Sequence, residues 1–257
     1  MVPPDHYDVV DVKNPHMRAD TTIDRAKAHE QWEELRRTFS SIGLTVEVIP
    51  ATPGCEDMVF ARNPVFTGPG RRCVLANMRH PSRQREVPAF ERWFSARGWD
   101  VVHTTAMFEG GGDAIWHPRR DRIWMSHGFR SEPGALAGKF ADEIVELELV
   151  DERFYHLDTC FLALDRDTVL IHPPAFADPA PIHAHFRRVL EVDAHEAVTA
   201  LACNAAAFFG TDIVIDRRAT KTIAQLHDLG YRVHPVDTGE FLKSGGSVYC
   251  LHNYYPA

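Results

Sequence analysis

The sequence of 257 residues contains no run of the roughly 20 apolar residues that a membrane-spanning helix needs. Its start, MVPPDHYDVVDVKNP, has neither the basic region nor the apolar core of a signal peptide. The five cysteines lack the paired spacing of metal sites, and no HExxH motif is present. We therefore expect a cytoplasmic protein with reduced thiols, no metal, no other cofactor and no membrane partner.

Positive charge is also scarce. The chain has 28 Lys and Arg against 36 Asp and Glu, a formal net charge of -8. This balance argues against nucleic acid as a partner and suits a small cationic substrate. The hydrophobic fraction of 44% is ordinary and allows one sizeable core. We predict a single catalytic domain over residues 1–257, and the sequence leaves open whether the chain forms a homo-oligomer.

One layout recurs along the chain: an amphipathic helix ends at a glycine and a strand follows. The clear copies are HEQWEELRRTFSSIG before LTVEVIP, EVPAFERWFSARG before WDVVHT, and TIAQLHDLG before YRVHPVDT. A glycine just past a helix supplies the left-handed residue that ends it. Weaker copies are expected in LAGKFADEIVELELV and around HFRRVLEVDAHEA.

Between these copies lie five segments that begin with a polar cluster and continue as apolar, strand-like sequence. They are EDMVFARNPVF, EGGGDAIWHPRRDRIWM, HLDTCFLALDRDTVLIH, ACNAAAFFGTDIVID and GGSVYCLHNYY. A repeat period of about 50 residues indicates an array or a closed ring of units. In a ring the polar starts would point toward one central site. An ordinary α/β sheet is the alternative from the pattern alone.

Two of the polar clusters suit acid–base chemistry. The segment YHLDTCF predicts a strand with His156 and Asp158 on one face, because alternate strand residues share a face. A histidine beside a carboxylate can move protons next to a cationic group. In MFEGGGD, the glycines would let a ligand approach Glu109 closely. The ordinary alternatives are a core histidine, a turn cap and a glycine-rich hairpin.

Further polar side chains could hydrogen-bond a guanidinium, a carbonyl or a carboxylate. These are Asn14 in NPHM, Asp57 and Asn63 in EDMVFARN, Arg83 in HPSRQRE and Arg130 in HGFRSE. Taken singly, each is more typical of a turn, a cap or a solvated rim.

The stretch FLKSGGSVYCLHN, residues 241–253, predicts a strand at SVYCL with Val248 and Cys250 on one face. Gly245 and Gly246 at its entrance would allow close approach of a ligand or another backbone. Cys250 alone is either a small packed hydrophobe or, with a distant histidine, a candidate nucleophile.

Taken in order, these segments resemble one family. NPHM, EDMVFARN, RQRE, FEGGGD, GFRSE, FYHLDT, ACN and EFLKSGGSVYCL are similar to motifs of the guanidino-group modifying enzymes. That family includes arginine deiminases, arginine dihydrolases, dimethylarginine dimethylaminohydrolases and amidinotransferases. The resemblance runs from Tyr7 to Leu251. It implies the pentein fold, a five-bladed α/β propeller with pseudo-five-fold repeats around a central active site.

The resemblance also implies roles. Cys250 would be the nucleophile, His156 the general acid and base, and Glu109 the carboxylate that holds the guanidinium. The implied substrate-binding residues are Asn14, Asp57, Asn63, Arg83, Arg130 and Asp158. Attack by the thiolate on the guanidino carbon would give a covalent thiouronium, which water hydrolyses without a metal.

Asn14 and Asn63 match positions that carry Asn in the arginine dihydrolases, so the resemblance favours arginine as substrate and ornithine or citrulline plus ammonia as products. Pro64 departs from the small residue usual in that branch. The alternatives are a dimethylarginine dimethylaminohydrolase giving citrulline and methylamine, an amidinotransferase, and a non-catalytic pentein that binds a factor or protein. The stretch Asn14 to Thr22 is a predicted lid.

Overall fold

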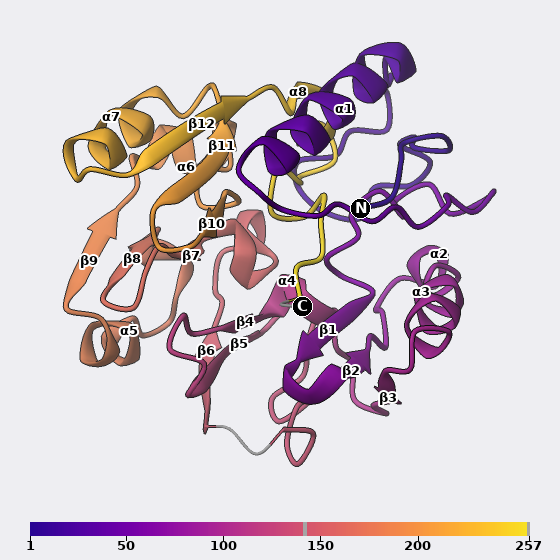
Figure 1. Cartoon of the computed structure of the whole chain (residues 1–257), viewed down its shortest axis with the longest axis horizontal. Coiled ribbons are helices and arrows are strands. Elements are labelled where there is room, and N and C mark those ends of the chain that lie inside the picture. Colours follow the sequence, from indigo (N-terminus) through magenta and orange to yellow (C-terminus); the bar gives the residue numbers. More distant parts are fainter. Residues whose placement is uncertain (141–142, 256–257) are drawn as a thin grey trace.

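Four sheets of three strands follow one another along the chain and surround the centre of the molecule (Figure 1). The computed structural model describes residues 1–140 and 143–255. In every sheet the first two strands are antiparallel and the third runs parallel to the second. The strands are β1 (Val65–Gly68), β2 (Arg72–Leu75), β3 (Asp100–Val102), β4 (Ala114–Trp116), β5 (Arg122–His127), β6 (Glu143–Glu148), β7 (Phe161–Ala163), β8 (Thr168–Ile171), β9 (Arg188–Glu191), β10 (Ala206–Phe208), β11 (Asp212–Asp216) and β12 (Arg232–Val236).

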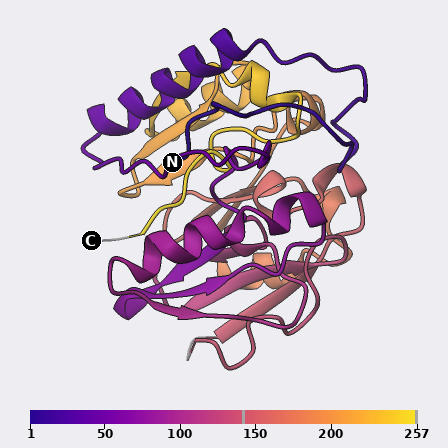
Figure 2. The same ribbon diagram turned by 90° about the vertical axis from the view of Figure 1, so that its right-hand side faces the viewer.

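Helices connect the strands and lie mostly toward the outside of the molecule (Figures 1 and 2). The α-helices are α1 (Arg25–Ser41), α2 (Pro81–Gln84), α3 (Val87–Ser95), α4 (Gly110–Asp113), α5 (Ala180–His185), α6 (Ala194–Thr199), α7 (Thr220–Asp228) and α8 (Gly239–Leu242). Short 3₁₀ turns are η1 (Pro69–Arg71), η2 (Glu152–Phe154), η3 (Leu157–Thr159) and η4 (Pro173–Ala175). No helix in the described part of the chain is both long enough and apolar enough to cross a membrane.

The three clear helix-to-glycine copies are confirmed as α1, α3 and α7. Gly43, Gly98 and Gly230 follow them with φ of 93°, 72° and 88°, the left-handed conformation that ends a helix. The strands expected after α3 and α7 are β3 and β12. Each pairs in parallel with the strand that precedes its helix, which makes the repeated unit two strands, a helix and a strand.

Several sequence predictions of secondary structure are wrong. LTVEVIP, residues 44–50, forms no strand. Among the described residues it is bonded to Met1, whose amino group donates to Glu47 O and whose carbonyl accepts the N–H of Ile49. SVYCL, residues 247–251, is a turn, closed by a bond from Leu251 N to Ser247 O. In YHLDTCF, His156 precedes the 3₁₀ turn η3 and only the last residue enters a strand.

The two weaker copies are confirmed in part. LAGKFADEIVELELV contains β6, but its residues 136–140 form turns instead of a helix, and residues 141–142 lie outside the described residues. HFRRVLEVDAHEA contains β9 and most of α6, and α5 ends at its first residue.

The four units fit a pentein-type α/β fold. The sector between the fourth and the first sheet holds α1, residues 44–50 and the C-terminal segment, residues 247–255, which runs between α1 and α3 (Figure 2). No strand is assigned to this sector among the described residues, so the fifth blade stays a prediction.

Candidate active site

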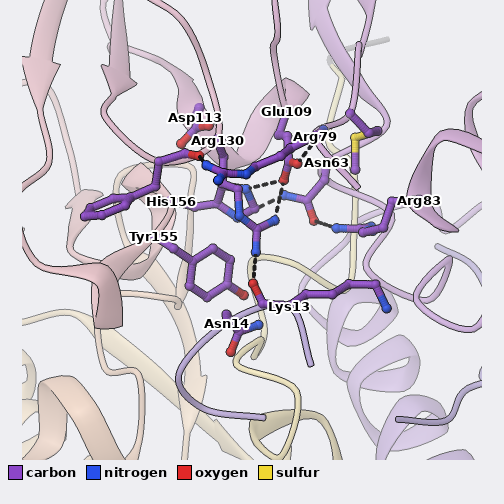
Figure 3. Close-up of polar contacts among 12 residues, drawn as sticks. Lys13, Asn14, Asn63, Arg79, Arg83, Glu109, Asp113, Arg130, Tyr155 and His156 are labelled. Carbon is purple, nitrogen blue, oxygen red and sulfur yellow. Dashed lines mark hydrogen bonds and ion pairs between the residues drawn. The ribbon is translucent and has the colours of Figure 1, made fainter. Parts of the chain in front are cut away.

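Glu109 and His156 meet at the centre of the molecule, each just before a short helical turn (Figure 3). Their closest atoms, Glu109 Oε2 and His156 Nε2, are 2.7 Å apart. Arg130 Nη1 donates to the same carboxylate oxygen at 2.9 Å, and the backbone N–H of Arg79 donates to Oε1 at 3.1 Å. Burial alone would raise the pKa of Glu109, but Arg130 and the hydrogen-bonded His156 outweigh it and lower the pKa below its usual range.

The glycines after Glu109 are needed for close packing by the protein itself. Gly110 has a φ of 53°, and a Cβ there would lie 2.2 Å from the carbonyl oxygen of Asn63. A Cβ on Gly112 would lie 2.2 Å from Asn63 Nδ2 and 3.2 Å from His156 Nδ1. The sequence suggested that these glycines admit a ligand. In the structure Gly110 makes room for the backbone carbonyl of Asn63, and Gly112 makes room for the Asn63 and His156 side chains.

Asn63 has a fixed amide orientation. Arg83 Nη1 donates to Asn63 Oδ1 at 3.0 Å, which leaves Nδ2 facing His156 Nδ1 at 3.4 Å (Figure 3). The assignment of oxygen and nitrogen follows from the arginine, since a guanidinium can only donate.

Arg83 is buried and extensively bonded. Its Nε and Nη2 form a bidentate pair with Glu86 at 3.1 and 3.0 Å, and Nη2 also donates to the carbonyls of Asp57 and Phe60. Glu86 itself is 1% exposed. A substrate carboxylate would therefore have to compete with Glu86 for Arg83, and the predicted role of Arg83 stays a prediction.

Cys250 lies in the turn of the C-terminal segment and is 2% exposed. Its Sγ is 3.3 Å from Asp158 Oδ2 and 3.2 Å from Asn204 Nδ2. Burial raises the pKa of the Cys250 thiol well above its usual value, and Asp158 raises it further, whereas the Asn204 hydrogen bond opposes them. Burial also raises the pKa of Asp158 to about 6, against the opposing effects of His156 and Cys250.

Asn14 and its neighbour Lys13 close the rim of the site. Asn14 Nδ2 donates to Ser244 O at 3.0 Å, and Arg130 Nη2 donates to Lys13 O at 2.7 Å (Figure 3). Lys13 Nζ lies 2.8 Å from Asp57 Oδ2. The loop before α1 is thus attached to the site by backbone and side-chain contacts.

Two buried carboxylate oxygens have no partner among the described residues. They are Asp57 Oδ1 and Asp158 Oδ1. The other oxygen of Asp57, Oδ2, is paired with Lys13 Nζ at 2.8 Å, which compensates the charge of this carboxylate. Buried acceptors without a donor are costly, so these two oxygens could accept hydrogen bonds from a ligand.

These side chains surround a cavity of about 20 Å³, room for about one water molecule. Its lining residues are Lys13, Asn14, Met17, Asp57, Phe60, Asn63, Arg83, Arg130, Tyr155, Ser244 and Cys250. The described conformation is therefore closed, and an amino-acid-sized ligand enters only if part of the wall moves.

All nine residues predicted for the site lie in this one cluster, through the contacts given above. The sequence reasoning did not identify Asn204, Glu86, Lys13 or Tyr155. Tyr155 donates its hydroxyl to Gly245 O at 2.8 Å and packs under Arg130, whose Cζ is 4.7 Å from the ring centroid. The motifs ACN and RQRE contain Asn204 and Glu86, but nothing in the sequence indicated what these two side chains bind.

Comparison with known proteins agrees with this geometry. The family model "N,N dimethylarginine dimethylhydrolase, eukaryotic" matches residues 8–253. The bifunctional arginine dihydrolase/ornithine cyclodeaminase ArgZ of Synechocystis is 37% identical, over 98% of this chain and 36% of that protein. The N(G),N(G)-dimethylarginine dimethylaminohydrolase of Mycobacterium tuberculosis is 35% identical, over 97% of this chain and 83% of that protein. The chain thus spans about a third of the length of ArgZ.

A solved structure of the N-terminal domain of ArgZ, an arginine dihydrolase, bound to product, superposes with a TM-score of 0.93 at 35% identity. The match covers 98% of this chain and 94% of that one. The fold and these likenesses define a member of the guanidino-group modifying superfamily. Within it, the chain belongs to the dimethylarginine dimethylhydrolase family.

Proposed function

We propose that this chain hydrolyses guanidino C–N bonds of arginine or an arginine derivative, with Cys250 as nucleophile. The observation that carries the proposal is the set of unpartnered carboxylate oxygens on Asp57 and Asp158 around a buried cysteine. A guanidinium supplies up to five planar N–H donors and a positive charge, which is what these acceptors lack.

Binding of such a cation would also activate the nucleophile. In the free protein burial and Asp158 hold the pKa of the Cys250 thiol high, so the sulfur is protonated. A guanidinium between the carboxylates neutralises Asp158 and favours the thiolate, whose proton is released to solvent. The free enzyme would thereby keep an unreactive thiol until a substrate is present.

The reaction then needs two proton transfers. The thiolate forms a C–S bond to the guanidino carbon, and His156 donates a proton to the nitrogen whose C–N bond breaks. Water attacks the thiouronium, His156 takes its proton, and the C–S bond breaks to regenerate Cys250. Glu109, 2.7 Å from His156, orients the ring and stabilises its charged form.

Arginine and two rounds of hydrolysis are the favoured reaction. Arg83 fixes Asn63 so that its N–H₂ faces the His156 side of the site, where it can donate to the ureido oxygen of citrulline. The Synechocystis relative carries an arginine dihydrolase activity in its name. The alternative is hydrolysis of methylated arginine to citrulline. It is supported by the Mycobacterium tuberculosis relative, which is named as a dimethylarginine dimethylaminohydrolase.

Product analysis separates these reactions. The purified chain is incubated with arginine, citrulline or asymmetric dimethylarginine, and amino acids, ammonia and methylamines are quantified. Ornithine from both arginine and citrulline supports two rounds, and citrulline alone supports a deiminase. Dimethylamine from the methylated substrate supports the alternative, and no product from any of them contradicts hydrolysis of these guanidino compounds.

We also infer that residues 14–22 act as a lid. The cavity of about 20 Å³ cannot hold arginine. Residues 14–22 are attached to other segments by three side-chain hydrogen bonds: Asn14 Nδ2 to Ser244 O, His16 Nε2 with Arg153 O, and Lys243 Nζ to Thr22 O. Breaking these bonds is a small cost compared with moving a sheet.

We also propose that residues 1–257 form one domain, with the sector around α1 as its fifth blade.

A further inference from the structure

A second and larger cavity, of about 640 Å³, lies between β4, β7, β10 and the C-terminal segment. It shares no lining residue with the pocket around Cys250, although Tyr249, the neighbour of Cys250, lines it. A volume of this size is typical of small-molecule sites. The proposed hydrolysis does not use it.

Three arginines line this cavity and form no ion pair with a described residue: Arg62, Arg120 and Arg166. Arg62 is 7% exposed; its Nε donates to Gly111 O at 3.2 Å, and its Nη2 donates to the Tyr249 hydroxyl. The exposed side chains of Arg120 and Arg166 line the same cavity and make no hydrogen bond or ion pair to any residue in 1–140 or 143–255. Arg62 is the buried one of the three, and a buried guanidinium that forms no ion pair with a carboxylate is costly.

The acids at the rim of the cavity are already engaged. Asp167, which lines the cavity, forms an ion pair of 2.5 Å with Arg119, which does not line it. Asp165 accepts the Tyr231 hydroxyl and the backbone N–H groups of Asp167 and Thr168. Neither carboxylate forms an ion pair with Arg62 or Arg120 in the described structure, so the positive charge in the cavity is left for a ligand.

The walls around Arg62 and Arg120 are aromatic. Trp116, Phe161, Phe208, Tyr249 and Tyr254 line the cavity. Arg62 Cζ lies 4.2 Å from the Tyr249 ring centroid, and Arg120 Cζ lies 5.8 Å from that of Trp116. Flat apolar walls of this kind suit a planar ring, while the guanidinium groups suit a carboxylate or phosphate attached to it.

We propose that this cavity binds a small organic anion, a planar ring that carries a carboxylate or a phosphate, with Arg62 and Arg120 as its charge partners. The site is separate from the pocket around Cys250 and does not depend on the proposed reaction. Arg62 is also bonded to the active-site segments, so Arg120 is the residue to vary.

The test is isothermal titration of the whole chain at low ionic strength with benzoate, adenosine monophosphate and inorganic phosphate. At least one of the two ring-bearing anions should bind, and Arg120→Gln should weaken it about 10-fold or more, the usual loss for a charge-assisted bond. Arg37→Gln removes the same charge from an exposed side chain of α1, outside the cavity, and should leave binding unchanged. The melting temperature of each variant checks its folding.

The titrations with benzoate and adenosine monophosphate distinguish a carboxylate ligand from a phosphate ligand. The titration with inorganic phosphate tests whether negative charge without a ring is enough for binding. Binding should persist in Cys250→Ser and in the presence of arginine. Three results would overturn the proposal: no binding of either ring-bearing anion at about 10 mM, equal weakening by Arg37→Gln, or competition by arginine, which would place the anion in the Cys250 pocket. Because the readout is binding, it does not depend on whether the chain is a hydrolase.

Discussion

Asn204 Nδ2 lies 3.2 Å from Cys250 Sγ, while Asn204 Oδ1 accepts the backbone N–H of Cys250 at 3.3 Å and of Ser247 at 2.8 Å. Nδ2 also donates to Asp158 O at 3.1 Å. The single Asn204 side-chain amide therefore binds the turn that carries Cys250 and joins it to the segment that contains His156. If Cys250 is the nucleophile, as proposed, Asn204 acts through it as a positioning residue.

Asn204→Ala should lower kcat about 10- to 100-fold with a smaller change in KM, since the thiolate loses a donor and the turn loses two anchors. It should also slow alkylation of Cys250 by iodoacetamide, which a merely structural loss elsewhere would not do. Asn253→Ala is the matched control: Asn253 lies in the same segment and donates to Val65 O at 3.0 Å. Equal losses in both variants would contradict a specific role for Asn204.

Cys250→Ser should abolish product formation, with a loss of about 10³-fold or more, while arginine still binds and the free energy of unfolding changes by about 1 kcal/mol or less. Cys203→Ser alters another buried thiol, one outside the site, and should keep its activity. Steady-state assays, calorimetry and denaturant titration measure the three quantities. Full activity of Cys250→Ser would exclude the covalent mechanism.

The pH dependence of Cys250 alkylation should report the high pKa of its thiol. Burial and Asp158 raise that pKa, so the rate in the free protein should keep rising with pH above the range of an ordinary cysteine. Asp158 is ionised above its own pKa of about 6, and there its negative charge disfavours the thiolate. Asp158→Asn should therefore shift the profile to lower pH.

Mass spectrometry of the peptide with Cys250 separates this reaction from alkylation of the other four cysteines. Below pH 6, where Asp158 itself becomes protonated, the two profiles should converge. An unchanged profile in Asp158→Asn would show that Asp158 does not influence the thiol.

Glu109→Gln should lower kcat by about 10²- to 10⁴-fold, because His156 loses the carboxylate that orients and charges it. Arg130 loses its ion pair at the same time, so substrate affinity should fall as well. Glu132→Gln, on an exposed side chain of the same region, is the control and should retain activity. A fall in affinity with unchanged kcat would assign Glu109 to binding alone.

Trypsin cleavage after Arg18 tests the lid. The Arg18 side chain is 81% exposed, and it lies in the segment that would open. Arginine bound to Cys250→Ser should hold the segment closed and slow this cleavage relative to cleavage at exposed sites elsewhere. Equal cleavage with and without arginine would count against a lid at residues 14–22.

The repeated helix, glycine and strand could be predicted from the sequence because local periodicity determines them. Apolar spacing and a left-handed glycine specify α1, α3 and α7 with no need of distant contacts. The clustering of Glu109, His156 and Cys250 followed from the order of the motifs, which the resemblance supplied.

The strands predicted at YHLDTCF and SVYCL failed for a physical reason. Alternating polarity was read as a strand, but the backbone bonds of these segments go to side chains of other units. Leu157 N donates to Asp113 Oδ1 at 3.3 Å, and the N–H groups of Ser247 and Cys250 donate to Asn204. Partners of this kind have no periodicity in the sequence, and for the same reason Asn204 and Glu86 could not be assigned.

The C-terminal segment lies outside all four described sheets and is held by hydrogen bonds, ring contacts and the buried side chains of Val248 and Leu251. Thr67 Oγ1 donates to Tyr254 O at 3.1 Å, and the Tyr255 ring packs on Trp99 with centroids 5.1 Å apart. The segment with the proposed nucleophile is thus joined to the four sheets by non-covalent contacts, such as a separate peptide could make. A chain cut before Ser247 and a synthetic peptide of the missing residues would form a split enzyme, in which selenocysteine could be installed in place of sulfur.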